Sequence, residues 1–194
     1  RIMCGINGIV TRSIDFPILK FGASMNQIIR HRGPDDEGGV AFNENSYYPL
    51  AYQDSVKRQD SISYLDFKST EEVLSPKVWL GHRRLSILDL SPLGHCPMSD
   101  DSNRYWLTYN GEIYNYRELR LELESEKFTF AGNSDTEVLL NLYLSFRDTP
   151  DQIELMLKKL NGIFAFALYD FERNTMLIVR DPFGVKPLYY ASAS

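Results

Sequence analysis

The first third of the chain alternates between short apolar runs and segments of helical spacing. Residues 4–10 form an apolar run with glycine at positions 5 and 8, which predicts a buried strand. Residues 17–30 open with a proline and repeat apolar side chains at helical intervals, so we expect a helix there. Residues 31–39 contain a Gly-Pro pair, adjacent acids and two glycines, which predicts a loop.

Short strands are expected in the middle of the chain. Residues 40–42, 47–52, 78–87 and 104–109 carry enough apolar or alternating positions to form them. Residues 53–77 are polar and aperiodic, so they are interpreted as a surface excursion.

Helices are predicted next. Residues 115–127 have apolar side chains along one helical face. Ser134 and Glu137 have the spacing of a capping box, in which each side chain binds a backbone amide of the first helical turn. Residues 149–152 indicate another helix start, with proline at the first helical position.

The last quarter of the chain predicts strands again. Residues 163–170 and 176–180 are apolar runs that can pair across a turn at 172–174. A tight turn at 181–184 is expected to lead into a final strand at 187–191. Because strands and helices are grouped apart, the order favours an α+β fold built of layers.

Composition narrows the class of protein. The chain has 194 residues, enough for one compact domain, and 43% of them are hydrophobic, which suffices for a core. The formal net charge of -5 argues against a nucleic-acid binder, which usually has a basic face. Two cysteines cannot form a disulfide framework, and no apolar stretch is long enough to cross a bilayer or to act as a signal peptide. We therefore expect a soluble cytoplasmic protein.

Cys4 is the first candidate for chemistry. A cysteine in an apolar strand is by itself usually a small core residue. If Met3 is a start residue that is removed, however, Cys4 becomes the first residue and its thiol lies beside its own α-amino group. An amine with a pKa of about 7.7–8.0 can take the proton of a thiol with a pKa of about 8.5, which activates the nucleophile.

Asn110 and Gly111 allow two interpretations. An asparagine side chain and a glycine amide could form an oxyanion hole. Asn-Gly is also the strongest short-range signal for a hairpin turn, and the dipeptide alone favours the turn.

Arg83, Arg84 and Asp135 are charged candidates. Adjacent arginines usually form a solvated face, but in a strand they point to opposite sides, so one could face a site and bind a carboxylate. Asp135 fits the start of a helix first and an ammonium ligand second. The three histidines have no metal-ligand spacing with one another or with Cys96, so no metal site is expected.

Five short motifs follow one another along the chain: Cys-Gly-Ile at 4–6, His-Arg-Gly-Pro-Asp at 31–35, Arg-Leu-Ser-Ile-Leu-Asp at 84–89, Asn-Gly-Glu-Ile-Tyr-Asn at 110–115 and Ser-Asp-Thr-Glu at 134–137. Their order resembles the class II glutamine amidotransferase family, in particular the amidotransferase domain of glutamine-dependent asparagine synthetases. Residues 160–167 and 180–189 are also similar to that family. The resemblance implies that residues 1–194 form one glutamine amidotransferase type 2 domain. Its fold would be a four-layer αββα sandwich of two antiparallel sheets, the Ntn-hydrolase fold.

The resemblance also implies roles for eight residues in the hydrolysis of glutamine to glutamate and ammonia. Cys4 would be the nucleophile, Asn110 and Gly111 the oxyanion hole, Arg84 the partner of the α-carboxylate, Glu112 and Asp135 the partners of the α-ammonium, and the main chain near Ile87 and Leu88 a guide for the substrate.

Partners follow from the same resemblance. A C-terminal ATP-pyrophosphatase synthetase domain, absent from this chain, would use ATP and Mg²⁺ to activate aspartate and receive ammonia through a tunnel. The glutaminase domain itself would need no cofactor. Two alternatives stay open: amidation of another acceptor in a cell-envelope or antibiotic pathway, and a non-catalytic regulatory relative. The oligomeric state is open as well, with a homodimer among the choices.

Arg1, Ile2 and Met3 depart from the family pattern. With these residues attached, the nitrogen of Cys4 is an amide and cannot act as a base. We interpret them as an expression remnant or as residues before the true start. A preparation that retains them is expected to be inactive or weakly active.

Overall fold

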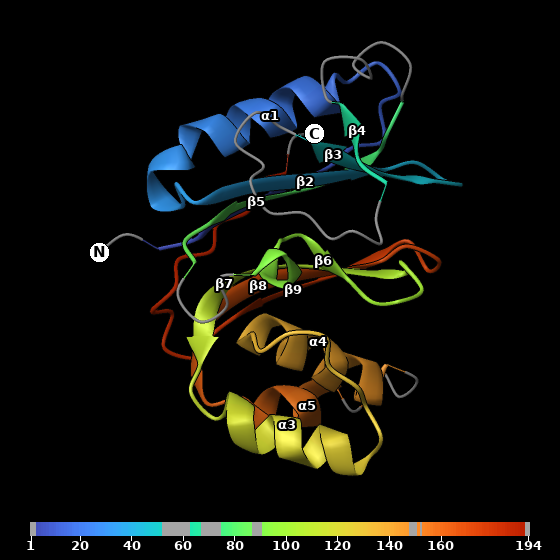
Figure 1. Ribbon diagram of the computed structural model, residues 1–194. Coiled ribbons are helices and arrows are strands. Elements are labelled where there is room, and N and C mark those ends of the chain that lie inside the picture. The colour runs from blue at the N-terminus through green and yellow to red at the C-terminus, as the bar shows by residue number, and fades with distance from the viewer. Residues whose placement is uncertain are drawn as a thin grey trace.

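The computed structural model shows a sandwich of four layers. It describes residues 3–51, 63–66, 75–86, 91–147, 151 and 153–192. Helix α1 (Ile18–Ile28) covers one sheet, and helices α3 (Tyr116–Ser125), α4 (Asp135–Phe146) and α5 (Ile153–Lys159) cover the other (Figure 1). The predicted αββα order is confirmed, as are helices close to the ranges expected from the apolar spacing.

The first sheet has the strand order β1-β5-β2-β3-β4. Its strands are β1 (Gly5–Val10), β5 (Val78–Arg84), β2 (Asp36–Phe42), β3 (Tyr47–Ala51) and β4 (Leu65–Asp66). Neighbouring strands run antiparallel, except that the two-residue strand β4 pairs in parallel with β3.

The second sheet has the order β6-β7-β8-β9 and is antiparallel throughout. Its strands are β6 (Met98–Ser99), β7 (Tyr105–Ile113), β8 (Gly162–Asp170) and β9 (Thr175–Arg180). Strands β7 and β8 pair along their whole length, from Tyr105 opposite Asp170 to Ile113 opposite Gly162. This long ladder connects the two ends of the sandwich.

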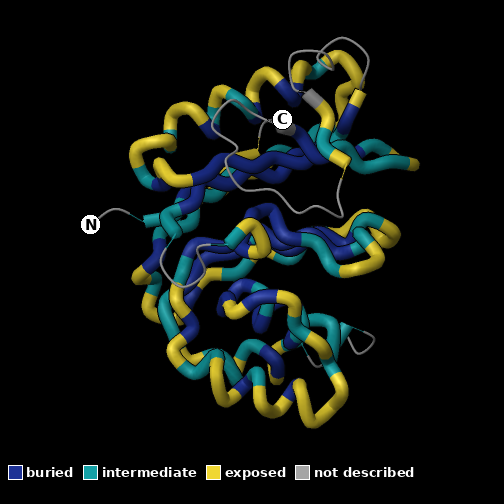
Figure 2. Tube along the Cα trace, viewed as in Figure 1, coloured by how far each residue is buried: buried dark blue, intermediate teal, exposed yellow. Residues whose placement is uncertain are grey.

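The alternation of side chains along the strands divides the core between layers. On β2, Val40 and Phe42 face the second sheet, where they meet Trp106. Ala41 between them faces the opposite way and packs with Trp79 under α1. Figure 2 shows the strands of both sheets largely buried between the helices. A period of two therefore serves two cores at once.

The start of α4 follows the capping prediction in part. The Ser134 side chain accepts a hydrogen bond from the Glu137 amide at 3.2 Å, as predicted. The Glu137 carboxylate does not return to Ser134 but accepts from the amides of Ala131 and Gly132, at 2.6 and 2.8 Å. The carboxylate therefore orders the loop that enters the helix.

The loop predicted over residues 31–39 is wrong in its second half. A short 3₁₀ helix spans Arg30–Arg32, and strand β2 begins at Asp36. The adjacent acids suggested a solvated loop, yet Asp36 and Glu37 are buried in the sheet, where they contact His95 and Arg83. Because the partners of these two acids are distant in the sequence, the polarity of the local segment could not indicate that the acids are buried.

The final strand predicted at 187–191 is also wrong, because these residues are described without strand structure. The residues between Asp181 and the predicted strand form a turn. The Asp181 carboxylate accepts hydrogen bonds there from the amides of Phe183, Val185 and Lys186. Burial alone would raise the pKa of Asp181, but these backbone donors hold it below its usual value.

Several expectations fall on residues outside the described ranges. The surface excursion at 53–77 and the helix start at 149–152 are described only in small part. In the part of the chain that the structure describes, no helix has the length and apolar character needed to span a bilayer.

Candidate active site

One cavity of about 120 Å³ gathers residues from both sheets and from the start of α4. Six of the eight predicted site residues line it: Cys4, Arg84, Asn110, Gly111, Glu112 and Asp135. Ile87 and Leu88 lie outside the described residues. Segments separated by more than a hundred positions in the sequence thus meet at one point.

Cys4 lies just before β1 and is held by its neighbours. The Leu85 amide donates to Cys4 Sγ at 3.3 Å, and Arg32 Nε donates to the Cys4 carbonyl at 3.1 Å. Burial raises the pKa of the Cys4 thiol, and the Leu85 amide and the charges of Arg84 and Lys186 offset this only in part. The resting side chain is therefore a thiol that needs a base.

Asn110 and Gly111 lie within strand β7, so the hairpin-turn interpretation is wrong. Pairing with β8 continues past them to Ile113. A Cβ atom on Gly111 would lie 2.5 Å from the Ile163 carbonyl oxygen, which is closer than such contacts allow. Glycine is required here by the approach of β8, and the buried Asn110 beside it lines the cavity.

The two adjacent arginines are both buried, so the solvated-face interpretation is wrong. Arg83 Nη1 lies 2.7 Å from Glu37 Oε2, its direct cross-strand partner on β2. Arg84 lines the cavity, and its Nη1 donates to the Ser91 carbonyl at 3.4 Å. Alternation along β5 therefore separates an arginine that pairs within the sheet from one that lines the cavity.

Asp135 and Glu112 place two carboxylates on the cavity. Asp135 is the first residue of α4, and its Oδ2 accepts from Tyr109 Oη at 2.7 Å and from the Ile113 amide at 3.1 Å. Burial raises the pKa of Asp135, and these donors offset the rise only in part. Glu112 is exposed at the rim.

His82 lines the cavity, although the sequence suggested no role for it beyond the rejected metal site. The Thr108 hydroxyl donates to the Gly81 carbonyl at 3.1 Å, so it must accept from His82 Nδ1–H, 3.0 Å away. Burial lowers the pKa of His82 to about 3, which keeps the ring neutral. Its position two residues before Arg84 on one strand face was the available signal.

Lys186 and Cys96 also line the cavity and were not predicted. Lys186 is nearly buried, and its Nζ lies 2.8 Å from Met3 Sδ. Burial raises the pKa of the Cys96 thiol to about 12, so this cysteine is a poor nucleophile. Lys186 belongs to the 180–189 motif, which carried no chemistry by itself.

Among the described residues, no three His, Cys, Asp or Glu side chains lie close enough together to hold a metal ion.

The chain is similar to several known proteins. Residues 67–194 match the family described as "Glutamine amidotransferase domain". "Asparagine synthetase [glutamine-hydrolyzing] 1" of Bacillus subtilis is 38% identical over 87% of this chain and 20% of its own length. "Amidase chry2" of Gibberella zeae is 33% identical over 97% of this chain and 24% of its own length. The solved structure of glutamine phosphoribosylpyrophosphate amidotransferase from B. subtilis superimposes with a TM-score of 0.66 at 23% identity, over 95% of this chain and 38% of that one.

The two facing sheets between helices, shared with that solved structure, define the class as the Ntn-hydrolase fold. The family match covers well over half of the sequence, and the chain therefore belongs to the glutamine amidotransferase domain family. It spans only a fifth to about a third of the length of the curated relatives it matches.

Proposed function

We propose that this domain hydrolyses glutamine to glutamate and ammonia with Cys4 as the nucleophile. The observation that carries the proposal is the meeting of Cys4, Asn110 and Gly111 with Arg84 and Asp135 around one small cavity. A thiol and a candidate oxyanion hole supply the reaction, and a cation and carboxylate supply recognition of an amino acid.

The reaction begins with the Cys4 sulfur attacking the side-chain amide carbon of glutamine. A C–S bond forms, and the negative charge on the former carbonyl oxygen is stabilised by the Asn110 side chain and the Gly111 amide. The C–N bond then breaks, and the nitrogen leaves as ammonia after taking a proton. Water attacks the γ-glutamyl thioester, releases glutamate and restores the thiol.

The base in this scheme is the α-amino group of Cys4, present only when Cys4 is the first residue. Burial raises the pKa of the Cys4 thiol, so an adjacent neutral amine is needed to take its proton. Met3 lines the same cavity and contacts Lys186, so its removal would free both the amine and space for substrate.

Selectivity for glutamine follows from the charges around the cavity. Free glutamine is a zwitterion, so its recognition needs a cation for the carboxylate and anions for the ammonium. Arg84 suits the carboxylate because its planar guanidinium can form two parallel hydrogen bonds. Asp135 and Glu112 suit the ammonium, and the main chain at Ile87 and Leu88 is predicted to orient the substrate.

The whole protein would use the ammonia in a second reaction. The similarity to the B. subtilis asparagine synthetase favours ATP-dependent amidation of aspartate by a further, C-terminal domain that uses Mg²⁺. The similarity to a Gibberella amidase supports a second candidate, in which the same glutaminase domain serves another acceptor. Residues 1–194 are the glutaminase domain in either case.

Ammonia release from glutamine tests the proposal directly. A chain that begins at Cys4 should hydrolyse glutamine, whereas its Cys4→Ala variant and the chain that retains Arg1, Ile2 and Met3 should show little or no activity. Equal rates for the Cys4-first chain and the Cys4→Ala variant would remove the enzymatic proposal. Production of glutamate in a 1:1 ratio with ammonia confirms that the side-chain amide is the bond cleaved.

A further inference from the structure

Tyr109 contacts Asp135 but has no part in the reaction steps proposed above. Its hydroxyl donates to Asp135 Oδ2 at 2.7 Å, and the Ile113 amide donates to the same oxygen at 3.1 Å. Both donors come from strand β7, four positions apart. The carboxylate at the start of α4 is thus held from one side by the edge of the sheet.

The hydrogen-bond donors to Asp135 are all neutral. They are the Tyr109 hydroxyl and the Ile113 amide on β7, and the amides of Asp135 and Thr136 at the start of α4, and the side chain is buried. A buried carboxylate is costly unless a cation or several hydrogen bonds offset the loss of water. These neutral donors fix its orientation, and a positive charge on the cavity side would further stabilise the carboxylate.

The same short segment of β7 also carries the candidate oxyanion hole. Asn110 and Gly111 lie between Tyr109 and Ile113, the two donors to Asp135. The ladder with β8 fixes this segment from end to end. The separation between the oxyanion position and the Asp135 carboxylate is therefore set by one rigid strand.

We propose that Tyr109 is a positioning residue that fixes the Asp135 carboxylate so that Oδ1 receives the α-ammonium of glutamine. This inference rests on the proposed glutaminase function. Tyr109 does not itself touch the reacting amide. It acts through Asp135, keeping the ammonium site at the correct distance from the Cys4 sulfur.

A Tyr109→Phe variant of the Cys4-first chain tests the inference, because it removes one oxygen and keeps the ring. The KM for glutamine should rise by about tenfold, the loss expected for one hydrogen bond to a charged group, while kcat changes little. The deamino analogue 4-carbamoylbutanoate keeps the amide and the carboxylate but lacks the ammonium. Its kcat/KM should be the same in the variant and the wild type.

Tyr105→Phe is the matched control. Tyr105 lies on the same face of β7 and is equally buried, but its hydroxyl has no hydrogen-bond partner among the residues that the structure describes. This variant should leave both substrates unaffected. On an Asp135→Asn background, Tyr109→Phe should have no further effect on the preference for glutamine over the analogue.

Calorimetric titration of Cys4→Ser chains separates binding from turnover. The preference for glutamine over the analogue should fall about tenfold when Tyr109→Phe is added. Equal losses with both compounds, or an unchanged preference, would overturn the inference even if the wild type hydrolyses glutamine. Failure of the wild type to hydrolyse glutamine would instead overturn the proposed function, and the binding preference would still decide the role of Tyr109.

Discussion

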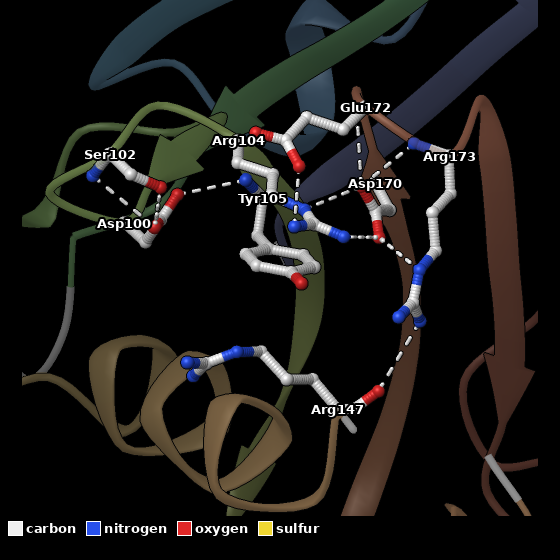
Figure 3. A network of polar contacts seen from close by, with 8 residues as sticks. All are labelled: Asp100, Ser102, Arg104, Tyr105, Arg147, Asp170, Glu172 and Arg173. Carbon is white, nitrogen blue, oxygen red and sulfur yellow. Dashed lines mark hydrogen bonds and ion pairs between the residues drawn. The ribbon is translucent and has the colours of Figure 1, made fainter. Parts of the chain in front are cut away.

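The two ends of the β7–β8 ladder each bury an aspartate, but they treat its charge differently. At one end, Asp170 receives Arg104 through two hydrogen bonds of 2.9 Å, and Arg173 lies nearby (Figure 3). At the other end, the hydrogen-bond donors to Asp135 are neutral groups of β7 and of the start of α4. The exposed fractions of the two side chains are both small, 2% for Asp170 and 6% for Asp135.

The pKa shifts of the two carboxyls run in opposite directions. Burial alone would raise both, but Arg104 and backbone donors hold the pKa of Asp170 below its usual value. At Asp135 burial prevails, and the pKa is raised despite its hydrogen bonds. A carboxylate that is paired with a cation of the same chain, as Asp170 is, stabilises the fold. One that is oriented but left without a cation is suited to a positively charged ligand.

Asp135→Asn should have the largest effect on function. Removing the negative charge should lower kcat/KM for glutamine by about 30- to 4000-fold, the range for losing one partner of a buried charge pair. The free energy of unfolding should change little, because the aspartate has no cation to lose. Steady-state ammonia release and urea unfolding measure the two quantities. A large loss of stability with normal kinetics would give Asp135 the role assigned to Asp170.

Asp170→Asn should show the reverse pattern. Breaking the pair with Arg104 should lower the free energy of unfolding by about 2–3 kcal/mol, less than for a fully buried pair because Arg104 is partly exposed and keeps Glu172. The kinetics of glutamine hydrolysis should be unchanged. Glu172→Gln is the control, since its exposed carboxylate should contribute less than about 1 kcal/mol. Impaired hydrolysis by a stable Asp170→Asn chain would contradict the division between the two ends.

The pH dependence of stability should also differ in sign. Asp170 has a lowered pKa in the folded state, so its contribution is present above the ordinary carboxyl pKa of about 3.9 and is lost as the pH falls through the folded value. Asp135 has a raised pKa, so the folded state holds its proton more tightly and its contribution declines as the pH rises above about 3.9.

Urea unfolding between about pH 3.5 and 6 can separate these contributions. The stability advantage of the wild type over Asp170→Asn should grow across this range, whereas that over Asp135→Asn should shrink. Two trends of the same sign would contradict the assignment.

Tyr105→Phe should have the smallest effect. Within the described part of the chain the buried Tyr105 hydroxyl has no hydrogen-bond partner, so its removal should raise the free energy of unfolding by up to about 1 kcal/mol. Thermal unfolding of Tyr105→Phe and Tyr109→Phe compares the stability lost by removing each hydroxyl, of which only that of Tyr109 donates to a carboxylate among the described residues. A loss of stability as large as that of Tyr109→Phe would show that the Tyr105 hydroxyl contributes to the fold.

The layered fold was predictable because its helices and central strands carry strong periodic patterns. The apolar spacing of α1 and α3 and the capping residues of α4 indicated these helices from the sequence. Local polarity was misleading at Asp36 and Glu37, which are buried beside partners that are far away in the sequence. The strand predicted at 187–191 is absent, and the residues just before it are held by Asp181 through local hydrogen bonds.

The candidate site could be predicted from motif order but not from single residues. Asn110 and Gly111 alone favoured a turn, and only the ladder with β8 shows why glycine is needed within a strand. Tyr109 and Lys186 were missed because nothing in their own sequence context marks them, and for His82 the signal was its place two residues before Arg84 on the same strand face. Their roles depend on which atoms meet in three dimensions.

The two tryptophans of the chain occupy different layers. Trp79 packs under α1, with its Nε1 donating to Asn7, while Trp106 lies between the two sheets against Phe42. Their intrinsic fluorescence therefore reports two separate events, the docking of α1 and the closing of one sheet on the other. Replacing either tryptophan with phenylalanine leaves a single tryptophan fluorophore, whose signal during refolding gives the rate of one of the two events.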